Sequence, residues 1–137
     1  MPKKILIVDD EEKIRFLLQK ALEGQYDVLT APEGLSAVEL VKKERPDLVF
    51  LDFNMPGPDG VAVLKLIKET GQCPVVWMLT GVDDLGTVLK ALETGAAGYI
   101  TKPLEIEKIR SIAADALNSP GTGGQPGARP WQVKKTE

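Results

Sequence analysis

The sequence predicts an α/β protein with a doubly wound, five-stranded parallel sheet, and three observations support this fold class. Five short apolar runs recur at regular intervals, and a segment of helical character follows each of them. The runs are nearly continuous and do not alternate with polar residues, as is typical of strands buried on both faces. Glycine and proline residues separate the segments. Strands that alternate with helices imply right-handed crossovers and therefore a parallel sheet.

The expected strands are residues 4–8, 26–30, 47–51, 75–79 and 98–101. Residues 14–22, 85–92 and 109–116 have apolar side chains spaced three, four and seven positions apart, which predicts amphipathic helices after the first, fourth and fifth strands. Segments 33–44 and 59–70, after the second and third strands, are expected to be helical with less regular faces. Gly24, Gly71 and Gly95 lie just past the expected ends of three helices.

Five strands in a chain of 137 residues favour the flavodoxin-like order 2-1-3-4-5. Sheets of this kind bind ligands beyond the carboxyl ends of the strands, at the point where the strand order reverses. We therefore expect a binding crevice between the first and third strands.

The composition excludes several kinds of chemistry. The chain has no histidine, so histidine-ligated zinc, Ser-His-Asp triads and imidazole bases are excluded, and a metal would have to take oxygen ligands. A net charge of −3 and a pI near 5.1 predict no direct binding of nucleic acid. Cys73 is the single cysteine, and no signal peptide or long apolar span is evident, so we expect a cytoplasmic protein that does not enter a membrane.

Polar residues follow four of the five apolar runs. Asp9 and Asp10 follow the first, Asp52 the third, Thr80 the fourth and Lys102 the fifth. The carboxyl ends of parallel strands share one edge of the sheet, so these side chains are expected to converge there. Three carboxylates suit Mg²⁺, which prefers oxygen ligands and can bridge to a phosphate. Binding of a phosphate at the first strand–helix turn alone is disfavoured, because residues 9–12 are all acidic.

Each of these residues also has a purely structural interpretation. Asp9 and Asp10 could cap the following helix, and Thr80 could cap the fourth helix. Asp52 could be a loop acid, and Lys102 could be a solvated surface lysine. Their expected convergence at one edge favours the functional interpretation.

Four motifs, KILIVDDE, LDFNMPGPDG, LTG and GAAGYITKP, occur in this order at the ends of the expected strands. With these motifs, residues 3–117 resemble the receiver domain of two-component response regulators. The resemblance implies that Asp52 attacks the phosphorus of a phosphohistidine on a partner and becomes an acyl phosphate. It also implies that Asp10, Asp52 and the main-chain carbonyl of Asn54 ligate Mg²⁺, while Asp9 acts mainly through a bound water.

The same resemblance implies that Lys102 and Thr80 contact phosphoryl oxygens, and that Thr80 and Tyr99 form a switch. The switch would change the affinity of the face formed by the fourth helix, fifth strand and fifth helix for an output protein or domain. The phosphoryl donor would be a sensor histidine kinase or a phosphotransfer protein, and a phosphorylation-dependent dimer is compatible with this scheme. The protein would be a regulatory phosphoacceptor that catalyses only its own phosphorylation and dephosphorylation, not an enzyme acting on other substrates.

The sequence departs from the family pattern at one place. Six positions separate Pro74 from Thr80, one more than the family pattern has, so the fourth strand is expected either to begin earlier or to contain a bulge. The Lys102-Pro103 peptide bond lies where the family has a cis bond, so the resemblance implies that this bond is cis.

Two other functions stay open. A phosphatase of the haloacid dehalogenase type also uses Asp, Thr or Ser, Lys and Mg²⁺. Such enzymes, however, have an Asp-x-Asp motif after the first strand and usually a cap insertion. A degenerate receiver acting as a scaffold would lack Asp52, Thr80 or Lys102, and all three are present.

Two regions are expected along the chain. Residues 1–118 would form the receiver domain, and residues 119–137 a tail rich in Gly and Pro. The tail contains few apolar residues and is expected to be disordered, to link to a further domain, or to dock through Trp131.

Overall fold

The computed structural model describes residues 3–53, 55, 59–81 and 85–118, and it contains the predicted sheet. The strands are β1 (Lys4–Val8), β2 (Asp27–Ala31), β3 (Leu48–Asp52), β4 (Val75–Thr80) and β5 (Gly98–Thr101). All neighbouring strands pair in parallel, in the order β2-β1-β3-β4-β5. The predicted fold class and strand order are confirmed. The expected tail, residues 119–137, lies outside the described residues.

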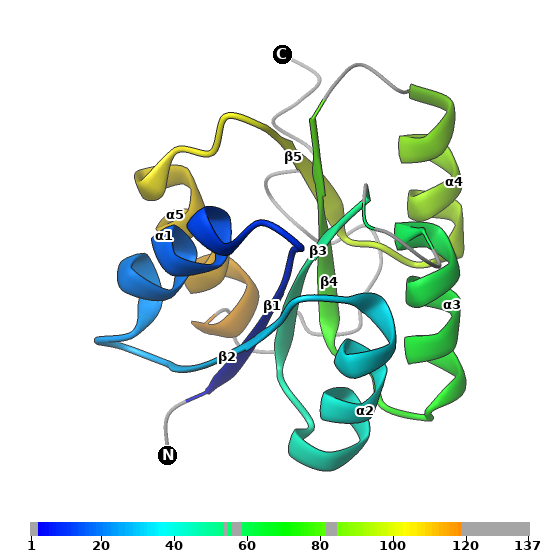
Figure 1. Cartoon of the computed structure of the whole chain (residues 1–137), viewed down its shortest axis with the longest axis horizontal. Helices are drawn as coiled ribbons and strands as arrows, with labels where there is room; N and C mark the ends of the chain where they lie inside the picture. Colours follow the sequence, from blue (N-terminus) through cyan, green and yellow to red (C-terminus); the bar gives the residue numbers. More distant parts are fainter. Residues whose placement is uncertain (1–2, 54, 56–58, 82–84, 119–137) are drawn as a thin grey trace.

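The helices form one layer on each side of the sheet (Figure 1). Helices α1 (Glu12–Leu22) and α5 (Ile106–Asn118) pack together on one face. Helices α2 (Gly34–Glu44), α3 (Gly60–Glu69) and α4 (Leu85–Thr94) cover the other. None of the helices in the described part of the chain has the length and apolarity needed to cross a membrane.

The buried apolar side chains form two clusters, one on each side of the sheet. Leu6 and Val8 of β1 belong to the cluster under α2, α3 and α4, whereas Ile5 and Ile7 belong to the cluster under α1 and α5. Successive side chains of a strand point to opposite faces, so a continuous apolar run supplies both clusters. This double burial explains why the strands lack polar alternation.

Three strands differ from the prediction at their ends. Strand β3, expected at residues 47–51, lies one residue later, at Leu48–Asp52. Tyr26 was expected to begin the second strand, but its N–H donates to the carbonyl of Leu22 at 3.1 Å, so it lies in the turn that follows α1, and β2 begins at Asp27. Strand β4 extends to Thr80, and its pairing with β3 and β5 is continuous in register. The extra position between Pro74 and Thr80 therefore lengthens the strand and forms no bulge.

The start of α3 packs closely against the end of β3. The Asp59 carboxylate accepts a hydrogen bond from the Ala62 N–H at 2.9 Å and caps the helix. The Gly60 N–H donates to the carbonyl of Phe53 at 3.2 Å. A Cβ atom at Gly60 would lie 2.9 Å from the Phe53 Cα and 3.0 Å from the Asp52 carbonyl oxygen. Only glycine leaves room for this approach to the backbone beside Asp52.

Candidate functional site

The predicted site residues come together at the carboxyl edge of the sheet. Asp52 is the last residue of β3 and Thr80 the last of β4, while Asp9 follows β1 and Lys102 follows β5. These four strands are consecutive neighbours in the sheet. The exposed fraction is 0% for Asp9, 1% for Asp52 and 2% for Thr80, so the edge encloses polar groups that are otherwise rarely buried.

Asp9, Asp10 and Asp52 form an acid cluster. Each contributes a carboxylate oxygen that lies within 4.8 Å of the corresponding oxygens of the other two. Asp9 and Asp52 are buried, and Asp10 is exposed. Like charges at about 4 Å repel by about 4 kcal/mol at the effective dielectric of a protein surface. The cluster therefore requires positive charge nearby.

Lys102 supplies part of that positive charge. Its Nζ lies 3.2 Å from Asp9 Oδ2, 3.5 Å from Asp52 Oδ1 and 3.6 Å from Glu11 Oε1. Burial alone would lower the pKa of Lys102, but the charges of Asp52, Asp9 and Glu11 outweigh this effect and raise the pKa above its ordinary value. Lys102 is therefore a fixed cation at neutral pH.

The turn from β1 to α1 holds Asp9 by three hydrogen bonds. The Asp9 N–H donates to the carbonyl of Ala31 at 3.2 Å, and Asp9 Oδ1 accepts from the Glu11 N–H at 2.9 Å. Arg15 Nη1 donates to the Asp9 carbonyl oxygen at 2.7 Å. Asp9 Oδ1 therefore fixes the turn before α1 and does not cap the helix, whose N-cap residue is Glu11, while Asp9 Oδ2 lies 3.2 Å from Lys102 Nζ.

The donor set fits a hard divalent cation. Asp9 Oδ2 is buried, and among the described residues its polar contact is the charged one with Lys102 Nζ at 3.2 Å. This oxygen and the two further carboxylates of the cluster provide the oxygen ligands that Mg²⁺ prefers. Asn54, expected to add a main-chain carbonyl, lies outside the described residues.

Thr80 is tied to Lys102 through the backbone. The Lys102 N–H donates to the Thr80 carbonyl at 2.7 Å, and Thr80 pairs with Thr101 across β4 and β5. The Lys102-Pro103 bond is cis. Tyr99 is half-buried on β5 and packs against the apolar cluster under α2, α3 and α4. Tyr99 and Thr80 thus lie on neighbouring strands, with Tyr99 in register with Met78, two positions before Thr80.

Two residues near the site were missed by the sequence analysis. Glu11 joins the ion pairs of Lys102, and Arg15 binds the carbonyl of Asp9. Glu11 could have been suspected because it directly follows the aspartate pair. Arg15 lies six positions after Asp9, and its contact depends on how the turn folds back over the first turn of α1.

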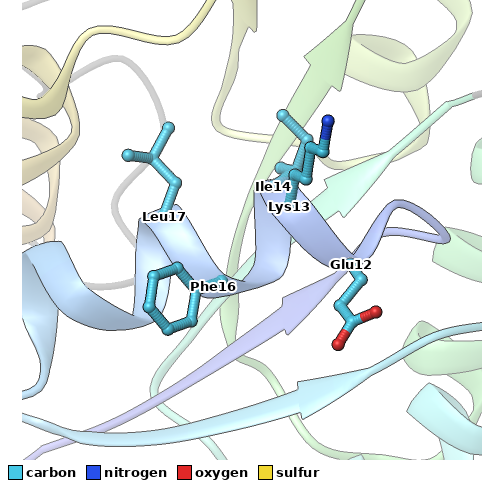
Figure 2. A pocket seen from close by; sticks show the side chains of 5 residues that line it. All are labelled: Glu12, Lys13, Ile14, Phe16 and Leu17. Atoms are coloured by element: carbon cyan, nitrogen blue, oxygen red, sulfur yellow. The ribbon is translucent and has the colours of Figure 1, made fainter.

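A separate pocket lies on the outer side of α1 (Figure 2). Its cavity has a volume of about 520 Å³ and is lined by Glu12, Lys13, Ile14, Phe16 and Leu17. Phe16 is 60% exposed and Leu17 36% exposed. No residue of the acid cluster lines this pocket, so it is distinct from the carboxyl edge.

The chain is similar to known proteins over most of its length. Residues 5–114 match the family described as response regulator receiver domain. The chain is 40% identical over 118 residues to the sporulation initiation phosphotransferase F of Bacillus subtilis, with 85% of this chain and 95% of that protein covered. It is 37% identical over 120 residues to the chemotaxis protein CheY of Halobacterium salinarum, with 87% and 100% covered.

Longer proteins and solved structures are similar as well. The alkaline phosphatase synthesis transcriptional regulatory protein PhoP of Bacillus subtilis is 41% identical over 112 residues, which are 81% of this chain but only 47% of that protein. The BeF3-activated DrrB receiver domain has a TM-score of 0.79 and 31% identity, with 86% of this chain and 99% of that one covered. CheY4 of Vibrio cholerae has a TM-score of 0.80 and 28% identity, with 85% and 100% covered.

The fold and the acid cluster define a receiver-type α/β domain of two-component signal transduction. The chain belongs to the response regulator receiver domain family.

Proposed function

We propose that this protein is a phosphorylation-dependent switch in which Asp52 accepts a phosphoryl group from a phosphohistidine, with Mg²⁺ as cofactor. The observation that carries the proposal is the environment of the Asp52 carboxylate. It ends β3 at the carboxyl edge, is 1% exposed, and has Oδ1 3.5 Å from Lys102 Nζ. The chain belongs to the receiver family, which favours this function over that of a haloacid dehalogenase-type phosphatase.

In the transfer step, an Asp52 carboxylate oxygen forms a bond to phosphorus. The phosphorus–nitrogen bond of the donor breaks, and the histidine nitrogen leaves with the electron pair. Phosphoryl transfer depends mainly on in-line positioning and charge stabilisation. These 137 residues contain no histidine, so the donor histidine lies outside this sequence, and we expect it on a sensor histidine kinase or a phosphotransfer protein.

Asp10, Asp52 and the main-chain carbonyl of Asn54 would hold Mg²⁺, and Asp9 would contribute through a bound water. When bound, the cation supplies electrostatic stabilisation of the phosphoryl oxygens. The Asp9 and Asp10 carboxylates converge on Asp52 from the β1–α1 turn, within 4.8 Å, which supports this assignment.

Lys102 and Thr80 would bind the transferred group. Lys102 Nζ lies 3.2 Å from Asp9 and 3.5 Å from Asp52, so a short movement would bring the ammonium group into contact with a phosphoryl oxygen on Asp52. Thr80, buried at the end of β4, would donate its hydroxyl to another oxygen. The dianionic group would thereby shift the population of two states, with Tyr99 moving into the space that Thr80 leaves.

The consequence is a changed affinity for an output protein or domain at the α4-β5-α5 face. This output could include a second phosphorylated copy. Residues 1–118 would act as the receiver and residues 119–137 as a tail or linker. We expect the protein to act in the cytoplasm. It would catalyse only its own phosphorylation and dephosphorylation.

Intact-mass spectrometry after incubation with acetyl phosphate tests the proposal. The expected result is one phosphoryl adduct that requires Mg²⁺ and is absent from an Asp52→Asn variant. The conservative Asp59→Asn variant is the control, since Asp59 caps α3 outside the acid cluster and should leave the adduct intact. An adduct that persists in Asp52→Asn would contradict the assignment of Asp52.

A further inference from the structure

We propose that Arg15 is a positioning residue for the cation site, which it serves by fixing the turn that carries Asp9 and Asp10. The inference rests on the proposed function, because it concerns the same Mg²⁺ site. Arg15 lies on α1 and donates from Nη1 to the main-chain carbonyl of Asp9 at 2.7 Å. Among the described residues, no hydrogen bond or ion pair joins Arg15 to a carboxylate of the acid cluster. It would therefore act through the backbone and not as a ligand.

The turn between β1 and α1 explains why one hydrogen bond matters for Asp10. The strand side of the turn is fixed by the Asp9 N–H to the Ala31 carbonyl, and the helix side by the Glu11 N–H to Asp9 Oδ1. The Asp9 carbonyl belongs to the peptide group that joins Asp9 to Asp10. Arg15 holds this peptide group. Without Arg15 the peptide plane could rotate, and the exposed Asp10 carboxylate would no longer be directed at the acid cluster.

Electrostatics favours a cation at this position. Among the described residues, Lys102 forms ion pairs with Asp9, Glu11 and Asp52, and the exposed Asp10 carboxylate completes the acid cluster. The Arg15 guanidinium places a second positive charge beside the main-chain carbonyl of Asp9, to which it donates.

The pocket on α1 gives an independent site on the same helix. Phe16 and Leu17 project from its outer side in Figure 2, and Arg15 is not among the residues that line the pocket. A Phe16→Ala variant therefore changes the neighbouring side chain of α1 without touching the turn. It separates an effect of Arg15 from a general effect on the exposed face of the helix.

Arg110 provides a matched control for the chemistry. Its Nε donates to the carbonyl of Ala21 at 3.0 Å, so it is also an arginine bound to a main-chain carbonyl, but at the opposite end of α1 from the site. Arg110→Met loses the same kind of contact as Arg15→Met. A purely structural role of such contacts would give both variants the same behaviour.

The test is direct cation binding to the full chain. Mn²⁺, which also favours oxygen ligands, is titrated and its free concentration read by electron paramagnetic resonance, with Mg²⁺ as competitor. Changes in residues that orient metal ligands commonly weaken binding by about 10- to 100-fold. We expect Arg15→Met to raise the dissociation constant roughly tenfold, Arg15→Lys to give an intermediate value, and Arg110→Met and Phe16→Ala to match the wild type.

Two further measurements keep the outcomes distinct. Circular dichroism confirms that each variant is folded during the titration, and Arg15→Lys serves if Arg15→Met does not fold. Acetyl phosphate labelling of Arg15→Met should recover the wild-type maximal rate at saturating Mg²⁺, since only cation binding is impaired. Wild-type cation affinity in folded Arg15→Met, or an equal loss in Arg110→Met, would overturn the positioning role. Absence of cation binding in the wild type would instead overturn the cation site of the proposed function and this role with it.

Discussion

Replacing Lys102 by methionine should destabilise the protein more than the loss of any exposed lysine. The substitution keeps much of the side-chain volume and removes the positive charge from two buried carboxylates. At an effective dielectric of about 20, a pair of unit charges at the Lys102–Asp9 distance of 3.2 Å attracts by about 5 kcal/mol, and the Asp52 pair at 3.5 Å by nearly as much.

Most of this gross attraction is offset by desolvation. Removing one partner of a buried ion pair usually costs about 3 to 5 kcal/mol, because the remaining charge has no compensation. Since the Lys102 side chain is 19% exposed, we expect the lower end of this range, about 3 kcal/mol in the free energy of unfolding without Mg²⁺. Mg²⁺ should restore more stability to the variant than to the wild type, because a bound cation replaces the missing charge.

Urea unfolding followed by circular dichroism, with and without MgCl₂, measures both effects. Lys42→Met is the matched control: Lys42 pairs with Glu39 at 3.9 Å, both side chains are exposed, and such a pair contributes about 0 to 1 kcal/mol. An equal loss in the two variants would refute the calculation, and so would equal stabilisation of Lys102→Met and wild type by Mg²⁺.

The pH dependence has a defined sign. The pKa of Lys102 is raised in the folded protein, so its contribution is complete below the pKa of an unfolded lysine and is lost as the pH rises through the folded value. The stability difference between wild type and Lys102→Met should therefore be constant around neutral pH and shrink only in the alkaline range. A difference that already disappears at neutral pH would contradict the raised pKa.

Three further predictions follow from the site and its surroundings. Asp10→Asn removes one of three clustered charges from an exposed position, so it should stabilise the cation-free protein by up to about 1 kcal/mol and abolish stabilisation by Mg²⁺. Urea unfolding measures both effects, and a loss of stability in the cation-free variant would count against charge repulsion in the cluster. Gly60→Ala places a Cβ 2.9 Å from the Phe53 Cα and should cost about 1 to 3 kcal/mol in the same assay, whereas Gly24→Ala, with open space around it, should not. Thr80→Ala should still be phosphorylated by acetyl phosphate but should no longer change its affinity for the output partner, as measured by calorimetry; a wild-type change in affinity would exclude Thr80 as the switch.

Much of the fold could be predicted because burial on both sides of the sheet leaves continuous apolar runs in the sequence. The limits of β2 could not be predicted, because Tyr26 is a residue type common in strands. The hydrogen bond of its N–H to the Leu22 carbonyl shows that it lies in the turn after α1. The length of β4 was ambiguous for a similar reason. An additional residue can extend a strand or form a bulge, and the pairing of β4 with both neighbours decides between them.

The candidate site was predictable where position along a strand determines it. Asp9, Asp52, Thr80 and Lys102 lie at strand ends, so the topology brings them together without further information. The role of Arg15 could not be predicted in this way. Its contact with the Asp9 carbonyl depends on the conformation of a three-residue turn, and no periodicity or charge pattern in the sequence specifies that conformation.

The most direct test of the central claim is the location of the phosphoryl group. Borohydride reduces an acyl phosphate on aspartate to homoserine, which tandem mass spectrometry of peptides identifies. After incubation with acetyl phosphate and Mg²⁺, reduction should convert Asp52 alone to homoserine, and Asp9 and Asp10 should remain aspartate. Homoserine at Asp9 or Asp10, or a phosphoryl group that resists reduction and maps to another side chain, would contradict the assignment of Asp52 as the acceptor.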